Sequence, residues 1–360
     1  MIGGTGPTGP FVVAGLRARG YDVAILHRGE HEVPEIPPEV LHLHTDPWSG
    51  EAVASCLGER RFDVVVASYG RLREIAQVLA GRAGRFLAIG GVPVYRGWMR
   101  PEDCTPEGLP VPTGEDAPKV ANAAELRKGF QILRSEEAVF AHHPDATIFR
   151  YPHVYGPRQL VPREWCIVRR ILDGRRRLVL GDGGLTLHTF GYAENLAHAL
   201  LLAVDQPEVA AGRVYNCGDE QVWSLRQVAL TIARLMDHEL EIVPVPGAFA
   251  FPTQPLLAHE RTDHRVMDLT RIKAELGYRD AVPTGEGLRR TVDWLVANRP
   301  EPGGLTEKIL GDTFDYVAED QIAAAQRRYE AELRDVVYTE RPGPGLSYVP
   351  ADRRGLAREE

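Results

Sequence analysis

The glycines near the start of the chain constrain the fold more than any other feature. Residues 3–9 read GGTGPTG, with a glycine at every third position. This spacing allows a tight turn, lets backbone N–H groups approach a pyrophosphate, and lets a helix pack closely on a strand. The pattern that follows predicts a helix over 9–19 and a strand over 21–26. This order is typical of the first βαβ unit of a dinucleotide-binding fold.

The strand before this loop is short, because only Met1 and Ile2 precede the glycines. It would be the central strand of a doubly wound sheet, and strands usually have about 5–6 residues. We therefore expect the natural start to lie about four residues upstream, with an internal valine codon misread as the start. Mass spectrometry of the native protein tests this expectation, which an N-terminus at Met1 would contradict.

Strands and helices alternate in the following part of the chain. Apolar runs indicate strands at 61–70, 85–97 and 146–159, and helical patterns lie at 50–58, 71–83 and 120–141. Residues 101–118 are rich in Pro, Gly, Glu and Asp and indicate an exposed insertion. Alternation of this kind predicts an α/β fold with a doubly wound parallel sheet.

The composition argues against several classes of protein. A net charge of −8 and a pI of about 5.9 disfavour a general nucleic-acid binder. The apolar runs are too short for a membrane span, and the start carries no secretory signal. The cysteines show no paired spacing, so we expect neither disulfides nor a metal site; they are Cys56, Cys104, Cys166 and Cys217. We expect a cytoplasmic protein without nucleic-acid or membrane partners.

The end of the second strand bears on the choice between NAD and NADP. NAD-binding proteins usually place Asp or Glu there, to hold the ribose hydroxyls. This chain has His27 and Arg28 instead, and a guanidinium can pair with the 2′-phosphate of NADP. The sequence therefore favours NADP, with NAD as the alternative. The competing interpretation is that Arg28 is a solvated loop residue.

Several segments, in their order and spacing, resemble one known family. They are GGTGPTG at 3–9, AIGGVPVY at 88–95, FRYPHVYGP at 149–157, LGDGGLTLHTFGYAENLAHAL at 180–200, GRVYNCGDEQVWSLRQV at 212–228, DLTRIKAELGY at 268–278 and GLRRTVDWL at 287–295. The chain thus resembles the extended short-chain dehydrogenase/reductases, also called the NAD-dependent epimerase/dehydratase family. The resemblance implies a Rossmann lobe over 1–155 and a smaller α/β substrate lobe over 156–297, some of whose segments return to the first lobe. Residues 298–313 are rich in Pro and Gly and are expected to form a linker, 314–335 are expected to form a charged helix, and the end of the chain is expected to form a tail.

The resemblance also implies cofactor-binding positions and an assembly. The expected cofactor contacts are Gly3, Thr5, Gly6, Pro7, Thr8, Gly9, His27, Arg28, Asp46, Ser68, Gly90, Lys128, Tyr151 and Pro152. A homodimer is implied through the helices near 72–82 and 120–141. The expected partner is otherwise a small-molecule or nucleotide-linked substrate.

The proton relay of the family is not intact in this chain. Family members use a Ser or Thr, a Tyr that acts as acid and base, and a Lys four residues after the Tyr. Glycines occupy positions 90–91, where the hydroxyl residue is expected, and the segment 120–141 contains no tyrosine. Lys128 aligns either with the family's lysine, which leaves Ala124 at the tyrosine, or with the tyrosine, which leaves Ile132 at the lysine.

Three interpretations of this difference compete. Another residue supplies the acid, the reaction needs no such acid, or the protein binds the cofactor without turnover. The catalytic candidates are Lys128, His153 and Tyr151, since a histidine at 153 could donate a proton near neutral pH. The substrate candidates are His153, Arg158, Arg177 and His188, with Arg163 as a further arginine that could hold a diphosphate unless these arginines are a solvated surface.

These observations predict an NAD(P)-dependent oxidoreductase or epimerase/dehydratase. Its substrate would be a small or nucleotide-linked carbonyl or alcohol. The alternative is a dinucleotide-binding regulatory or scaffold protein without turnover, and turnover of a bound dinucleotide separates the two. A third possibility is an RNA-binding relative, against which the acidic net charge counts.

Overall fold

A parallel sheet organises the N-terminal part of the chain. The computed structural model describes residues 1–68, 70–340 and 343. Four strands lie side by side in the order β3 (Phe62–Ala67), β4 (Ala83–Gly91), β5 (Thr147–Tyr151) and β9 (Val214–Asn216). A second pair joins β1 (Ala24–His27) to β2 (Leu41–His44), and both groups are parallel throughout. The predicted Rossmann-type α/β fold is confirmed.

The first three residues link the two groups of strands. The amide of Ile2 donates to the carbonyl of Val66 at 2.7 Å, and the amide of Gly3 donates to the carbonyl of Leu26 at 2.8 Å. The ammonium of Met1 donates to the carbonyl of Ala24, and burial lowers its pKa to about 5. Residues 1–3 therefore occupy the central strand position between β1 and β3.

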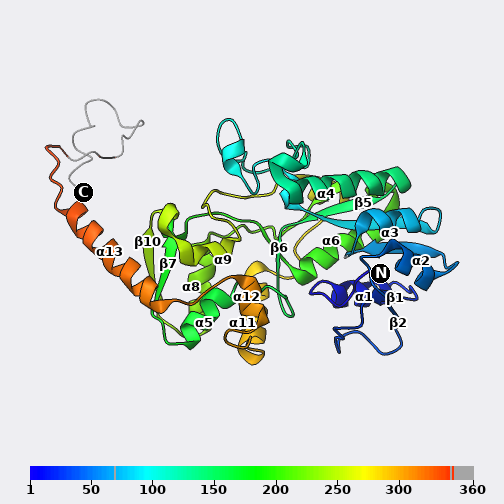
Figure 1. Ribbon diagram of the computed structural model, residues 1–360, viewed down its shortest axis with the longest axis horizontal. Coiled ribbons are helices and arrows are strands. Elements are labelled where there is room, and N and C mark those ends of the chain that lie inside the picture. Colours follow the sequence, from blue (N-terminus) through cyan, green and yellow to red (C-terminus); the bar gives the residue numbers. More distant parts are fainter. Residues whose placement is uncertain (69, 341–342, 344–360) are drawn as a thin grey trace. The chain divides into compact units, whose positions relative to one another are not determined.

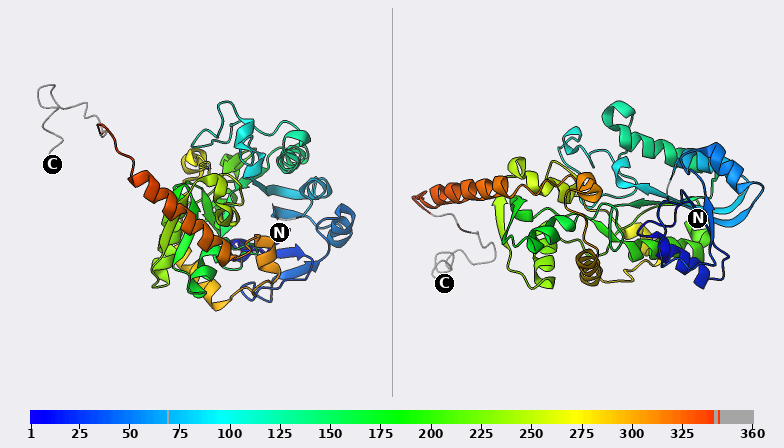
Figure 2. Two further views of the ribbon diagram at one scale, coloured as in Figure 1. Left: turned by 60° about the vertical axis from the view of Figure 1, so that its left-hand side comes forward. Right: turned by 60° about the horizontal axis from the view of Figure 1, so that its bottom comes forward.

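Helices cover both faces of this sheet (Figure 1). The helices α1 (Gly9–Ala18) and α6 (Ala193–Asp205) pack together on one face, and α2 (Gly50–Leu57), α3 (Leu72–Val78) and α4 (Ala123–His142) pack in a row on the other. Figure 2 shows α4 and α1 on opposite sides of the strands in its right-hand view. The expected helix over 71–83 is shorter, because the chain leaves α3 for a turn before β4.

A second hydrophobic core forms beyond β5. Its buried residues run from Tyr155 to Leu310 and pack α5 (Trp165–Leu172), α8 (Leu225–Leu235) and α11 (Thr284–Ala297) together. Two parallel strand pairs accompany it, β6 (His153–Tyr155) with β8 (Phe190–Tyr192) and β7 (Arg177–Gly181) with β10 (Glu241–Val245). The shorter helical elements are α7 (Pro207–Ala210), α9 (Gln254–Leu257), α10 (Thr270–Leu276), η1 (Val92–Val94), η2 (Pro101–Asp103), η3 (Asp182–Gly184), η4 (Gly247–Phe249) and η5 (Phe251–Thr253).

The segment expected to be a linker, 298–313, contains a packed helix, α12 (Leu305–Leu310). Glu307 accepts a hydrogen bond from the indole of Trp165 at 2.9 Å. Asp312 accepts two from Arg170, at 2.6 and 3.0 Å, and both side chains are buried. Glu307 and Asp312 are thus buried partners of α5. The Pro/Gly content of the segment did not indicate such packing.

Residues 317–360 form a separate unit from 1–316. Its helix α13 (Tyr316–Arg334) agrees with the helix expected near 314–335. The predicted tail from 341 onward lies outside the described residues, apart from Gly343. None of the described helices is long and apolar enough to cross a membrane.

Candidate functional site

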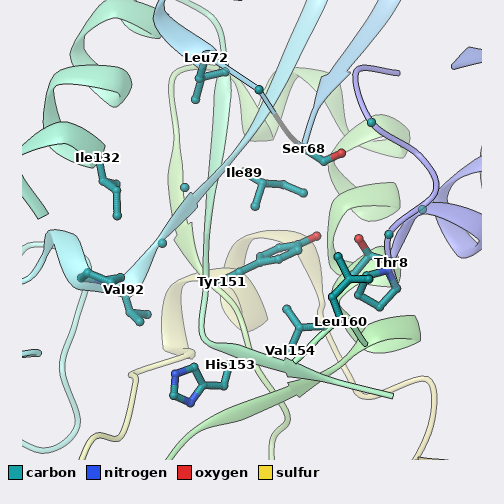
Figure 3. A pocket seen from close by; sticks show the side chains of 18 of the residues that line it. Thr8, Ser68, Leu72, Ile89, Val92, Ile132, Tyr151, His153, Val154 and Leu160 are labelled. Atoms are coloured by element: carbon teal, nitrogen blue, oxygen red, sulfur yellow. The ribbon is translucent and has the colours of Figure 1, made fainter. Parts of the chain in front are cut away.

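One pocket of about 990 Å³ lies at the carboxyl ends of the parallel strands. Figure 3 shows its side chains converging from the glycine loop, from strand ends and from α4. The loop after β6 and a short segment at 258–259 close the remaining wall. Ligands of doubly wound sheets bind at this edge of the sheet. The predicted cofactor positions that line the pocket are Gly3, Thr5, Gly6, Pro7, Thr8, Gly9, His27, Arg28, Ser68, Gly90, Lys128, Tyr151 and Pro152.

The glycine loop has a shape that side chains would block. A Cβ on Gly9 would lie 1.9 Å from the carbonyl oxygen of Gly4, and Gly4 itself has a φ of +120°. A Cβ on Gly6 would meet nothing within 4 Å, so this backbone is open toward the pocket. The loop leads into α1, whose first-turn N–H groups favour an anion. The loop therefore fits the pyrophosphate of a dinucleotide.

The end of β1 forms the neighbouring wall. Arg28 makes an ion pair with Glu30 at 3.0 Å, and both residues line the pocket. His27 is buried, and burial lowers its pKa. Asp46 does not line the pocket; its carboxylate accepts a hydrogen bond from the amide of Trp48 at 3.0 Å. Arg28 thus has a carboxylate partner, Glu30, two residues further along the chain. The sequence-based prediction considered an acidic residue at the end of the second strand only as far as Arg28.

Helix α4 supplies the wall opposite the glycine loop. Lys128, Gln131, Ile132 and Ser135 line the pocket, and their spacing places them on one face of the helix. A Cβ on Gly129 would lie 2.3 Å from the carbonyl oxygen of Pro93, so this glycine allows α4 to pack closely on η1. This close packing accompanies the position of Lys128 in the pocket wall.

A side chain in place of Gly90, where the family has its hydroxyl residue, would crowd a buried carboxylate. A Cβ there would lie 3.1 Å from Oε1 of Glu136, which is buried behind the strand. Glu136 accepts two hydrogen bonds from Arg150, at 2.9 and 2.7 Å. The glycine thus accommodates a buried ion pair where other chains of this type place a serine or threonine.

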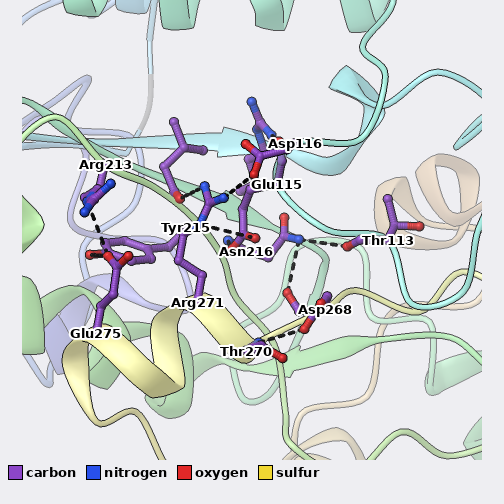
Figure 4. Close-up of polar contacts among 12 residues, drawn as sticks. Thr113, Glu115, Asp116, Arg213, Tyr215, Asn216, Asp268, Thr270, Arg271 and Glu275 are labelled. Carbon is purple, nitrogen blue, oxygen red and sulfur yellow. Dashed lines mark hydrogen bonds and ion pairs between the residues drawn. The ribbon is translucent and has the colours of Figure 1, made fainter.

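That ion pair belongs to a larger buried network. Arg150 also donates to the hydroxyl of Tyr95 at 2.9 Å and to the carbonyl of Glu115 at 3.0 Å. Figure 4 shows the part of this region around Asn216, whose amide nitrogen donates to the carbonyls of Thr113 and Asp268. Thr113 and Glu115 are buried, so the end of the expected exposed insertion is part of the core.

Tyr151 and His153 both line the pocket, but burial changes the pKa of each side chain. The hydroxyl of Tyr151 donates to the carbonyl of Leu196 at 3.0 Å, and burial raises its pKa well above the ordinary value. Burial also holds the pKa of His153 well below the ordinary value, with smaller contributions from His188 and Arg163. Burial therefore disfavours a charged imidazole at His153, and its role as a proton donor remains a prediction.

Three buried imidazoles meet at the end of the pocket near His153. The rings of His153 and His188 stack with centroids 5.0 Å apart, and each lies 6.0 Å from the ring of His259. Within the described residues, Nδ1 of His153, Nε2 of His188 and both ring nitrogens of His259 lack a hydrogen-bond partner. Burial lowers the pKa of His188 to about 3 and that of His259 to about 2. These three residues are called the imidazole cluster below.

Two arginines lie close to the imidazole cluster. Arg163 lines the pocket and donates to the carbonyl of Pro255. Arg265 is fully buried, donates to the carbonyl of Trp98 at 2.7 Å, and leaves Nη2 without a partner among the described residues. Burial lowers the pKa of Arg265 to about 10 and also lowers that of Arg163. This end of the pocket is rich in hydrogen-bond donors and positive charge.

The other predicted substrate residues lie outside the pocket lining. Arg158 pairs with Glu35 at 2.8 Å, and Arg177 pairs with Glu241 at 2.9 Å between exposed side chains. His188 is buried behind His153. The sequence reasoning missed Glu30, Gln131, Ser135 and His259, because none belongs to a recognised motif. The helical spacing of Gln131 and Ser135 from Lys128 was a signal that could have found those two.

Comparisons with known proteins agree with this geometry. The sequence model of the NAD-dependent epimerase/dehydratase family matches residues 115–218. The UDP-N-acetyl-alpha-D-glucosaminuronate decarboxylase of Bacillus cytotoxicus is 26% identical over 330 residues, which cover 82% of this chain and 96% of the relative. The dTDP-glucose 4,6-dehydratase of Actinoplanes is 32% identical over 165 residues, which cover 44% and 46%.

Solved structures share the fold. UDP-glucose 4-epimerase of Thermotoga maritima, solved with UDP-glucose, has a TM-score of 0.64 at 19% identity, covering 83% of this chain and 98% of its own. UDP-glucuronic acid 4-epimerase of Bacillus cereus, solved with UDP-glucuronic acid and NAD, has a TM-score of 0.63 at 16% identity, covering 82% and 98%. The glycine loop, the sheet order and the matched segment thus make the chain similar in sequence to the NAD-dependent epimerase/dehydratase family over residues 115–218 and similar in fold to these solved epimerases.

Proposed function

We propose that the protein is an NAD(P)-dependent enzyme that acts on a carbonyl or alcohol of a nucleotide-linked sugar. The observation that carries the proposal is a single pocket that runs from the glycine loop to Lys128 and the imidazole cluster. Its volume is large enough for a cofactor together with part of a substrate. Both the full-length relative and the solved structures described above are named for nucleotide sugars.

We further propose that the substrate places an anionic group beside Arg163. Glu30 is the only carboxylate among the described residues that line the pocket, and it lies at the opposite end beside Arg28. Cations removed from water are stabilised by an opposite charge, and neither the half-buried Arg163 nor the buried Arg265 makes an ion pair with a carboxylate in the described part of the chain. A carboxylate on the sugar and the diphosphate of the nucleotide both supply this charge.

Lys128 is the residue that we propose to hold or move the proton of the substrate hydroxyl. In the described residues, Tyr151 is the only tyrosine lining the pocket, and its hydroxyl already donates to Leu196. Lys128 lines the pocket at the helix face where the family's tyrosine or lysine would lie. A nicotinamide ring bound there would accept a hydride from the substrate carbon. His153, neutral at pH 7, would accept a hydrogen bond from a substrate hydroxyl.

The preference for NADP remains a prediction. Arg28 could hold a 2′-phosphate only by leaving Glu30, whereas Glu30 could itself accept hydrogen bonds from the ribose hydroxyls of NAD. The homodimer also remains a prediction, for which α3 and α4 are the proposed contact helices. These two helices pack on each other.

The experiment has two parts, binding and turnover. NADH and NADPH are titrated into the protein while nicotinamide fluorescence is followed, and UDP-glucose, UDP-glucuronic acid and UDP alone are then tested for binding and conversion by mass spectrometry. Dinucleotide binding with conversion of a UDP-sugar supports the enzyme. Binding without conversion of any nucleotide sugar supports the regulatory alternative, which the missing tyrosine favours.

Variants identify the anionic group. Arg163→Met should weaken UDP-glucuronic acid binding at least about 10-fold, since a charge-assisted contact contributes roughly 1.5–3 kcal/mol. Arg158→Met is the matched control, because Arg158 lies outside the pocket lining and pairs with Glu35. If UDP alone loses as much affinity, Arg163 binds the diphosphate; if only UDP-glucuronic acid does, it binds the carboxylate. Equal affinities of wild type and Arg163→Met for all three ligands would contradict the proposal.

A further inference from the structure

Three histidines and a glutamate meet at the end of the strand pair β1–β2. His27 is the last residue of β1 and is in register with His44, the last residue of β2. His42 and His44 are two positions apart on one strand, so their side chains point to the same face. Glu32 comes from the loop between the strands. No part of the mechanism proposed above uses His42, His44 or Glu32.

The ligand atoms of these residues are close enough to share one ion. Nδ1 of His42 lies 3.0 Å from one carboxylate oxygen of Glu32, and Nε2 of His44 lies 3.2 Å from the other. One atom from each of the four residues lies within 4.8 Å of the others. Tetrahedral zinc with bonds of about 2.0–2.1 Å holds its ligand atoms about 3.3 Å apart, which is close to these separations.

The hydrogen bonds within this group cannot all be satisfied by protons. The amide of Gly29 donates to Nδ1 of His27 at 3.1 Å, so the neutral ring carries its proton on Nε2. That proton faces Nδ1 of His42 at 3.2 Å, and the same Nδ1 faces Glu32. If Nδ1 of His42 is unprotonated and accepts from His27, its lone pair also faces the carboxylate of Glu32. If Nδ1 of His42 is protonated and donates to Glu32, its proton also faces the N–H of His27. A cation bound to Nδ1 of His42 and to Glu32 removes this conflict.

We propose that His42, His44 and Glu32 bind one divalent ion of the zinc type, through Nδ1, Nε2 and the carboxylate. Imidazole and carboxylate together suit Zn²⁺ and its neighbours better than Mg²⁺ or Ca²⁺. His27 is a positioning residue: its Nε2 lies 3.6 Å from Oε1 of Glu32 and would donate its proton to that carboxylate when the ion is bound. His44 and Glu32 are half exposed, so the ion can enter from solvent.

The site adjoins the pocket but is separate from its reacting end. His27 lines the pocket, as do Arg28, Glu30 and His31 from the same loop. An ion held by Glu32 on one side and by β2 on the other would tie this loop to the sheet. The ion would therefore fix the wall of the pocket that carries Arg28 and Glu30.

The test uses the full chain, without a histidine tag and stripped with a chelator. Zn²⁺ is titrated in by calorimetry, and Co²⁺ is added in parallel because its absorption spectrum reports four-coordinate binding. We expect one ion per chain. His44→Ala and Glu32→Gln should each weaken Zn²⁺ binding at least about 10-fold, since loss even of outer-shell partners costs 10–100-fold. His142→Ala, an exposed histidine on α4, should leave the affinity unchanged.

Both variants change half-exposed side chains, so their folds should persist, and circular dichroism with a thermal melt checks this. Binding of one Zn²⁺ that both variants weaken and His142→Ala does not would support the site. Absence of stoichiometric Zn²⁺ binding to the wild type would overturn it. Binding that His44→Ala and Glu32→Gln leave unchanged would overturn it as well, because the ion would then lie elsewhere.

Discussion

Two buried polar regions flank the pocket, and they differ in how completely they are satisfied. Around Arg150, every guanidinium nitrogen donates to a protein partner, and Glu136, Tyr95 and Glu115 receive these bonds. In the imidazole cluster, four ring nitrogens lack partners within the described residues. Buried polar groups are normally paired, so we take the first region as a structural support and infer that the second receives a ligand.

The two regions also differ in whether their buried arginine has a carboxylate partner. Arg150 is neutralised by Glu136: burial alone would lower the pKa of the guanidinium, but the hydrogen bonds and charge of Glu136 leave that pKa raised. Arg265 is also fully buried, but no carboxylate pairs with it among the described residues, and its pKa is lowered to about 10. A buried cation that lacks its opposite charge is a costly feature for a fold alone. A substrate anion near Arg163 would offset that cost.

The largest effect should come from breaking the satisfied region. Glu136→Gln should lower the free energy of unfolding by about 3–5 kcal/mol, because it leaves the buried charge of Arg150 uncompensated. Urea unfolding followed by circular dichroism measures the change. Glu137→Gln is the matched control: it removes the adjacent exposed partner of Arg134 and should cost less than about 1 kcal/mol. Equal losses in the two variants would contradict the view that burial distinguishes these pairs.

The buried carboxyl group of Glu164 should make the free energy of unfolding depend on pH. Burial raises the pKa of Glu164 to about 7, above its unfolded value of 4.5. The protonated form is favoured in the fold, so stability from this group is full below pH 4.5 and is lost as pH rises through 7. Glu164→Gln should therefore gain stability relative to wild type between pH 5 and 8, by about 3 kcal/mol at most. A pH-independent difference between the two proteins would show that Glu164 is ionised throughout.

The exposed ion pair of Arg28 and Glu30, at the other end of the pocket, should set the preference between NADPH and NADH. Glu30→Gln should raise the affinity for NADPH relative to NADH about 10-fold, or about 1.4 kcal/mol, by freeing Arg28 and removing a repulsive carboxylate. Arg28→Met should shift the ratio in the opposite direction. Fluorescence titrations of both variants measure the shift. Unchanged ratios in both would place the 2′-hydroxyl of the ribose away from this pair.

The smallest change in stability should come from the unsatisfied region. His259→Leu removes two buried ring nitrogens that have no partner, so the free energy of unfolding should change by less than about 1 kcal/mol. Its effect should appear in binding instead, as an affinity for UDP-glucuronic acid lowered at least about 10-fold. A loss of stability comparable to that of Glu136→Gln would mean that the imidazole cluster is structural after all.

The sequence predicted the backbone of the site better than its side chains. The glycine loop, the helix after it and the parallel strands follow from turn geometry and local apolar patterns, which neighbouring residues determine. The strand β2 was missed, because LHLH has few strand formers and its pairing with β1 is set by distant residues. With β2 the cluster of His42, His44 and Glu32 was missed too.

The remaining site residues depend on contacts between distant segments. His259 comes to His153 from more than a hundred residues away, through a loop without a motif. The titration of His153 could not be inferred either, since its pKa is set by burial and by Arg163, His188 and His259. The loss of the tyrosine was visible in the sequence, whereas the hydrogen bond that engages Tyr151 was not.

The anchoring of α12 has a practical consequence for any shortened version of this protein. Apolar periodicity ends with α11 near residue 297, and a designer guided by it would cut the chain there. Such a cut would remove the carboxylate of Asp312 from Arg170 and that of Glu307 from Trp165. These polar contacts, and not apolar periodicity, indicate that a shortened chain must reach at least residue 312 for helix α5 to keep its partners.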